Sequence, residues 1–284
     1  FKGTFDGLNN TITVKLADQD SKELGLFHTL DAAAEIKNLS LEGSMSVSQA
    51  TPVVAGTLAV YNDGAALTKV TNKATLSFSG RKPLPRQVIS ADWSAWRTSV
   101  RSTPIATIPA NSSSRGQPGR SFIGGIVAGT ADKTEGSLVN CTNKGNFSFD
   151  FPGAVDTGQY GGLFGHAEKS NWTFSNCTNE GTFTVTFADP GHQFHSLGGI
   201  LATGYGVFDN CVNKGKIMFN NSNGTKYRRT GGIVGCVGSD AGLGYTLRMT
   251  ELPQRGRHRG FDGIGRRSDR HCRKVASPAL IETV

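Results

Sequence analysis

Short runs of alternating apolar and polar residues follow one another along most of the chain. The segment 146–151 reads Asn-Phe-Ser-Phe-Asp-Phe, an alternation typical of β-strands that bury one face. Long helical periodicity is absent, and no apolar run approaches the roughly 18 residues that a membrane span needs. The pattern therefore predicts an all-β protein built from short strands.

These runs belong to an internal repeat. A paired-glycine motif followed by apolar residues begins at Gly124, Gly161, Gly198 and Gly231, at spacings of 37, 37 and 33 residues. The first three copies are each followed by the motif Asn-Cys-x-Asn-x-Gly, at 140–145, 176–181 and 210–215, and then by an alternating run. Three strands per unit, separated by Gly or Asn turns, describe one coil of a solenoid.

One such coil cannot bury its apolar face alone, whereas stacked coils bury a continuous core. We therefore predict a parallel β-solenoid, a right-handed β-helix, of about six or seven coils with repeats of about 33–37 residues. The paired glycines fit corners where a Cβ atom would clash or where a positive φ is needed.

Stacking places equivalent residues of successive coils above one another, which predicts side-chain ladders along the solenoid axis. The two predicted asparagine ladders are Asn140, Asn176 and Asn210, and Asn143, Asn179 and Asn213. The motif cysteines form a third column of Cys141, Cys177 and Cys211, which aligns with Leu39 and Val70 in the N-terminal part. This alignment favours small buried side chains over disulfides or a metal site.

The chain divides into four segments by composition. Residues 1–80 form degenerate N-terminal coils, 121–240 carry the regular repeats, and the segments 81–120 and 241–284 are Arg-rich and lack the motifs. The formal net charge of +8 arises in the two Arg-rich segments, at +6 and +5, while the rest of the chain is at −3. Because the chain begins at Phe1 without Met, we expect a fragment or a processed form.

The segment 81–120 stands where a unit is expected, since Val70 and Cys141 are 71 residues, or two periods, apart. A shifted reading frame permits both repeat motifs there in register, so we hypothesise a frameshifted repeat, and a similar frame error after residue 240. The alternative is a real inserted loop and a real basic tail, which would favour anionic partners.

The opening Phe1-Lys2-Gly3-Thr4-Phe5-Asp6-Gly7 with Asn10-Thr11-Ile12, and the run Gly162-Leu163-Phe164-Gly165, carry a resemblance. These residues resemble the GLUG-type repeats of surface and secreted proteins of gut Bacteroidetes and related bacteria. The resemblance covers roughly 1–80 and 121–240. It implies a parallel β-helix, an extracellular location on the bacterial outer surface, an adhesin-like or glycan-binding role, and no catalytic residues.

No residue pattern points to catalysis, so we predict a protein that is not an enzyme and has no cofactor or metal. The alternative is a carbohydrate-active enzyme, a polysaccharide lyase or hydrolase, on the same fold. The expected partners are host or dietary glycans or surface proteins; nucleic acid is not expected, because the repeats are slightly acidic. The candidate ligand contacts are aromatic residues placed in variable turns, where they would either stack on sugars or cover the flank: Tyr160, Trp172, Phe194, Tyr205 and Tyr227.

Overall fold

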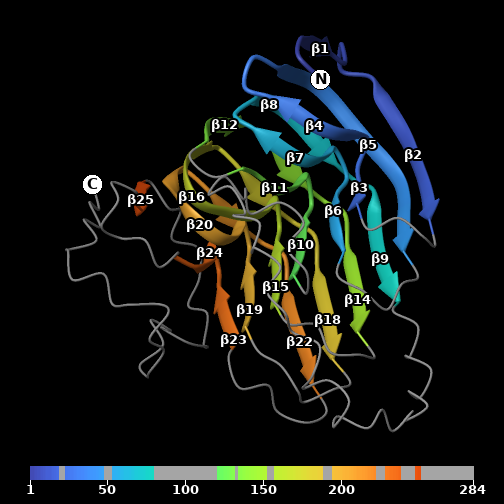
Figure 1. The fold of residues 1–284 in the computed structure, drawn as a ribbon, viewed down its shortest axis with the longest axis vertical. Coiled ribbons are helices and arrows are strands. Elements are labelled where there is room, and N and C mark those ends of the chain that lie inside the picture. The colour runs from blue at the N-terminus through green and yellow to red at the C-terminus, as the bar shows by residue number, and fades with distance from the viewer. Residues whose placement is uncertain are drawn as a thin grey trace, which may run out of the picture.

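A computed structural model describes residues 1–18, 23–47, 53–79, 120–131, 134–151, 157–187, 194–221, 228–237 and 247–250. In these ranges the secondary structure consists of strands, without a helix, and every strand pairing is parallel. The predicted parallel β-solenoid is therefore confirmed. Figure 1 shows its strands stacked side by side, from β1 (Thr4–Asp6) and β2 (Thr11–Asp18) at one end to the orange C-terminal strands at the other.

One side of each coil belongs to a six-stranded sheet. Its strands, in spatial order from the C-terminal end, are β23 (Arg228–Gly231), β19 (Phe194–Gly198), β15 (Thr157–Gly161), β10 (Arg120–Gly124), β6 (Val54–Gly56) and β3 (Glu23–Leu24). Each member comes from a successive turn of the chain.

The remaining sides belong to one nineteen-stranded sheet. Besides β1 and β2, its N-terminal strands are β4 (Phe27–Asp31), β5 (Glu35–Val47), β7 (Ala59–Asp63), β8 (Ala66–Asn72) and β9 (Thr75–Ser79). Its middle strands are β11 (Val127–Gly129), β12 (Glu135–Val139), β13 (Thr142–Asn143), β14 (Phe147–Phe151), β16 (Phe164–Ser175), β17 (Thr178–Asn179) and β18 (Phe183–Phe187). Its C-terminal strands are β20 (Leu201–Asp209), β21 (Val212–Asn213), β22 (Ile217–Asn221), β24 (Val234–Cys236) and β25 (Leu247–Thr250).

The alternation seen in the sequence sorts side chains between the core and the surface. In β14, Phe147 and Phe149 are buried while Ser148 and Asp150 are exposed. Phe183 of β18 packs on Phe147 with ring centroids 4.6 Å apart. Each fully buried side chain of this size contributes roughly 1.5–3 kcal/mol, so the repeated apolar positions form one continuous core along the axis.

The paired glycines occupy corners where successive coils approach closely. A Cβ atom on Gly162 would lie 1.7 Å from the carbonyl oxygen of Gly199, and one on Gly125 would lie 2.0 Å from that of Gly162. At a second corner the backbone takes a positive φ, 54° at Asn140 and 53° at Asn176. Asparagine tolerates this left-handed conformation better than most residues, which explains the recurring Asn before the buried Cys.

The coils on either side of residues 80–119 pair directly with one another. Leu76 of β9 is in register with Phe147 of β14, and Asn72 of β8 is in register with Asn143 of β13. No coil lies between these neighbours, although the sequence spacing suggested a missing unit at this place. The frameshift hypothesis itself concerns residues that, apart from Arg120, lie outside the described ranges.

The C-terminal segment 241–284 was expected to be an aberrant Arg-rich tail without repeat motifs. The structure instead places Leu247–Thr250 on the stack as β25, with Phe208 of β20 opposite Met249. Apolar residues at Leu247 and Met249 pack against the core, so the repeat region reaches beyond residue 240. The rest of that segment lies outside the described residues.

Candidate binding face

Three of the predicted aromatic ligand contacts are wrong. Tyr160, Trp172 and Tyr205 lie in strands rather than turns, and their exposed fractions are 0%, 1% and 1%. Trp172 packs on Phe164 with ring centroids 4.8 Å apart, and burial raises the pKa of the Tyr160 hydroxyl. Rings buried in this way cannot stack on a sugar at the surface.

The two other predicted aromatic contacts are not placed by the structure. Phe194 begins β19, but its side chain is not described, and Tyr227 lies outside the described residues. Neither residue can therefore be assigned to a binding surface.

The inner asparagine ladder forms as expected. The Asn143 amide donates to Asn179 Oδ1 at 2.7 Å, and the Asn179 amide donates to Asn213 Oδ1 at 2.8 Å. Asn72 extends the ladder by one coil, because its amide donates to Asn143 Oδ1 at 2.9 Å. Asn72, Asn143 and Asn179 are buried, so these bonds satisfy amides that water does not reach.

The outer asparagine ladder forms in part. The Asn210 amide donates to Asn176 Oδ1 at 2.8 Å on the exposed corner. Asn140 has the same positive φ at this corner, but no amide hydrogen bond joins it to Asn176 in the described residues. The positive φ at this corner therefore explains the recurring asparagines of the outer column better than hydrogen bonds between their amides do.

The predicted cysteine column is buried and unbridged. Cys141, Cys177 and Cys211 are at most 1% exposed, and all three are free thiols. Cys177 Sγ donates to the carbonyl oxygen of Leu138 at 3.2 Å, and Cys211 Sγ to that of Phe174 at 3.3 Å. Burial raises the pKa of the Cys177 thiol, and the three thiols pack as small buried side chains.

Among the described residues, no three His, Cys, Asp or Glu side chains converge as metal ligands. No helix in the same ranges is long and apolar enough to cross a membrane.

A regular polar surface, which the sequence analysis missed, covers one side of the solenoid. It lies on the C-terminal half of β5 and on β9, β14 and β18, where outward positions of adjacent strands are in register. We call it the hydroxyl face. It consists of Ser44, Ser46, Thr75, Ser77, Asn146, Ser148, Thr182 and Thr184.

The hydroxyl face has two columns that run along the solenoid axis. In one column, Ser46 is in register with Ser77, Ser77 with Ser148, and Ser148 with Thr184. The other column contains Ser44, Thr75, Asn146 and Thr182, with Ser44 paired to Thr75. All eight side chains are exposed or half-buried, so every coil of the four presents two small polar groups to solvent.

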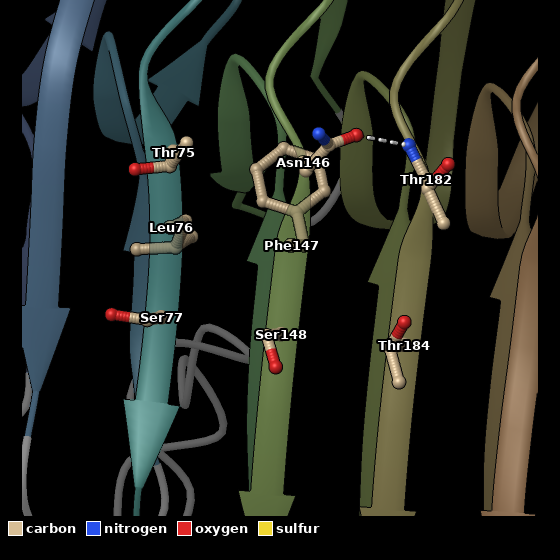
Figure 2. Close-up of a pocket in the computed structure, with 8 residues that line it drawn as sticks. All are labelled: Thr75, Leu76, Ser77, Asn146, Phe147, Ser148, Thr182 and Thr184. Carbon is tan, nitrogen blue, oxygen red and sulfur yellow. Dashed lines mark hydrogen bonds between the residues drawn. The ribbon is translucent and has the colours of Figure 1, made fainter.

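A shallow groove of about 460 Å³ crosses three strands of this face (Figure 2). It is lined by Thr75, Leu76, Ser77, Asn146, Phe147, Ser148, Thr182 and Thr184. Leu76 and Phe147 are buried beneath the polar positions. The Thr182 backbone N–H donates to Asn146 Oδ1 at 2.9 Å, which fixes the Asn146 side chain and leaves its amide protons for another acceptor.

Charged side chains lie next to the hydroxyl face but not within it. At the neighbouring corner, Glu180 lies 3.1 Å from the Lys214 amine and 3.4 Å from the Lys144 amine. The hydrogen bond from Lys214 and the two positive charges hold the pKa of Glu180 below its ordinary value. Asp150 borders the face on β14 as an exposed carboxylate.

Several hydroxyl groups of this face remain available for hydrogen bonds to a ligand. Those of Ser77, Ser148 and Thr184 make no hydrogen bond to any described residue, and that of Thr75 makes a long one of 3.5 Å to Gly43 O. Each hydroxyl can both donate and accept. The face is thus a rigid, uncharged array of available donors and acceptors.

Comparisons with known proteins do not assign this chain to a family. No protein-family model matches it, and no curated protein matches it. The resemblance to GLUG-type repeats therefore rests on the motifs alone, and the function has to be argued from the surface.

Proposed function

We propose that the protein is an extracellular, non-catalytic repeat protein of the bacterial surface that binds glycans through the hydroxyl face. One observation supports this most: eight uncharged polar side chains stand in two columns along the axis, and six of them line a groove. The motif resemblance to surface and secreted bacterial proteins points the same way.

The chemistry of the face suits sugars. A sugar hydroxyl is both a donor and an acceptor, and so are the side chains of Ser77, Ser148 and Thr184. The parallel sheet holds these groups in place before a ligand arrives, which lowers the ordering cost of binding. Each contact is weak, so useful affinity requires several contacts at once.

An adhesive role follows from the same geometry. A solenoid is a stiff rod whose side chains repeat at each coil, so a long glycan can engage several coils together. Binding of this kind needs no reaction at the ligand and no side chain with a shifted pKa in the groove.

The test compares one substitution on the face with the same substitution elsewhere. Ser148→Lys places a long charged chain in the centre of the groove, whereas Thr173→Lys changes an exposed position of β16 away from it. We expect native gels containing soluble polysaccharides to retard the wild type and Thr173→Lys. Ser148→Lys should bind about tenfold more weakly or worse, a loss of about 1.4 kcal/mol.

Both variants should keep the wild-type circular dichroism spectrum, because both positions are exposed. The proposal fails if no polysaccharide retards the wild type. It also fails if Ser148→Lys is retarded as strongly as Thr173→Lys.

A further inference from the structure

We infer that the ligand is an uncharged, linear glycan that lies along the solenoid axis, across β5, β9, β14 and β18, and meets each coil once. This inference rests on the proposed function and adds the charge, direction and length of the glycan. Three observations carry it: the shape of the groove, the distribution of charge and the ends of the hydroxyl face.

The groove is elongated along the axis. Its lining residues come from three adjacent coils, but from a stretch of only three residues on each: 75–77, 146–148 and 182–184. Adjacent strands lie about 4.8 Å apart, whereas outward positions of one strand are about 6.6 Å apart. An extended chain along the axis therefore meets polar groups at the closer spacing, while a chain along one strand would leave the groove after two groups.

Figure 2 shows the same arrangement at the level of side chains. Ser77, Ser148 and Thr184 stand on three successive strands at the same height, and Thr75, Asn146 and Thr182 form a second row above them. The two rows can contact opposite edges of a single chain of sugar rings. Small side chains keep the floor low enough for a ring to approach the sheet.

Charge argues for an uncharged glycan. The eight residues of the hydroxyl face include no Lys, Arg, Asp or Glu, so an acidic sugar would lose water without gaining a cation. The corner lysines Lys144 and Lys214 pair with Glu180, whereas Lys15 and Lys73 border the face without belonging to it. The exposed carboxylate of Asp150 repels an anionic chain as well.

Both ends of the hydroxyl face are marked by a change of side chain. Beyond β5, Lys15 and Ala17 of β2 pair with Ser44 and Ser46. Beyond β18, Met218 of β22 pairs with Thr184 and is 41% exposed. The array is thus four coils long, which spans about 14 Å between its first and last strands.

The inference predicts how affinity depends on the length of the glycan. Isothermal titration calorimetry with the full chain would use neutral cello-, xylo- and manno-oligosaccharides of two to eight units, with oligogalacturonates of the same lengths as the acidic series. For the neutral series that binds, the Kd should fall at least about tenfold from two units to about four, and then change less than about twofold. The acidic series should bind at least about tenfold more weakly.

Variants at the ends of the array test the direction of the chain. Ser46→Lys and Thr184→Lys stand on the first and last strands of one column. Each should shorten the length at which affinity stops rising by about one unit, while Ser148→Lys removes most binding and Thr173→Lys leaves the length profile unchanged. A chain lying along one strand could not respond to both end variants.

The two proposals fail in different ways. If glycan binding is lost in Ser148→Lys, the proposed function stands. The inference is nevertheless overturned if oligosaccharides of two and five units bind equally well, or if oligogalacturonates bind more strongly than the neutral series. Absence of binding to every glycan overturns both.

Discussion

At the scale of single residues, buried amides decide how the coils are held in register. Asn179 donates to Asn213 Oδ1 and to the carbonyl oxygen of Gly181, and it accepts from Asn143. Losing its side chain would remove three hydrogen bonds and leave an N–H of the buried Asn143 amide without its acceptor. Bonds of this kind contribute about 0.5–1.5 kcal/mol each, and a stranded buried group costs about 1–3 kcal/mol.

We therefore expect Asn179→Ala to lower the free energy of unfolding by about 3 kcal/mol or more. The matched control is Asn176→Gly on the exposed corner, because glycine accepts the φ of 53° without strain. That variant should lose less than about 1 kcal/mol. Urea unfolding followed by circular dichroism measures both, and equal losses would show that the inner ladder does not hold the coils together.

At the scale of strands and corners, the repeat motifs predicted the structure at the motif residues themselves. Register, the inner ladder and the buried cysteines all followed from residues that recur at equal spacing, since stacked coils superimpose such residues. Tyr160 was misplaced because β15, Thr-Gly-Gln-Tyr-Gly, carries no clear alternation. Trp172 was misplaced although the end of β16 does alternate, because this run lies outside the recurring motifs. The hydroxyl face was missed because Ser148 and Thr184 look like ordinary solvent-facing residues until the register aligns them.

The corner charges give a prediction about acid stability. The pKa of Glu180 is lowered in the folded protein from its ordinary value of 4.5 by Lys214 and Lys144. The stabilisation it provides is therefore present above about pH 4.5 and is lost as the pH falls through the lower folded value. Because the residues are largely exposed, the effect should be small and weakened by salt.

Glu180→Gln should accordingly leave thermal stability less dependent on pH between about 3 and 5 than it is in the wild type. Melting temperatures measured across this window in low and high salt provide the check. Glu135→Gln, at an exposed carboxylate of β12 for which no ion pair is formed in the described residues, is the control. A pH profile of Glu180→Gln that coincides with the wild-type profile would contradict the role of the corner charges.

At the scale of the whole molecule, the continuity of the stack does not depend on residues 80–119. The coils before and after them meet along five pairs of strands: β6 with β10, β7 with β11, β8 with both β12 and β13, and β9 with β14. Sequence could not show this, because a distance of 71 residues between equivalent positions fits two periods equally well. Direct pairing means that the two halves of the chain form one core.

The connection from β9 to β10 can therefore be shortened greatly. Other coils make the equivalent step with 152–156, 188–193 and 222–227, which are five or six residues each. We expect replacement of residues 80–119 by six Gly and Ser residues to preserve the circular dichroism spectrum and the melting temperature within a few degrees, because the closure entropy of a shorter loop is slightly lower. The chain should also become less basic, since residues 80–119 carry five Arg and one Lys against one Asp.

Loss of the cooperative melting transition in this deletion would mean that the segment supplies contacts the stack requires. Retained melting together with retained glycan retardation would show that the hydroxyl face, which crosses this junction between β9 and β14, is built by the flanking coils alone. The groove spans the same junction, so one deletion examines the continuity of both the core and the binding surface. Ser148→Lys in the deleted chain should again weaken binding about tenfold, because the strands that carry the groove are unchanged.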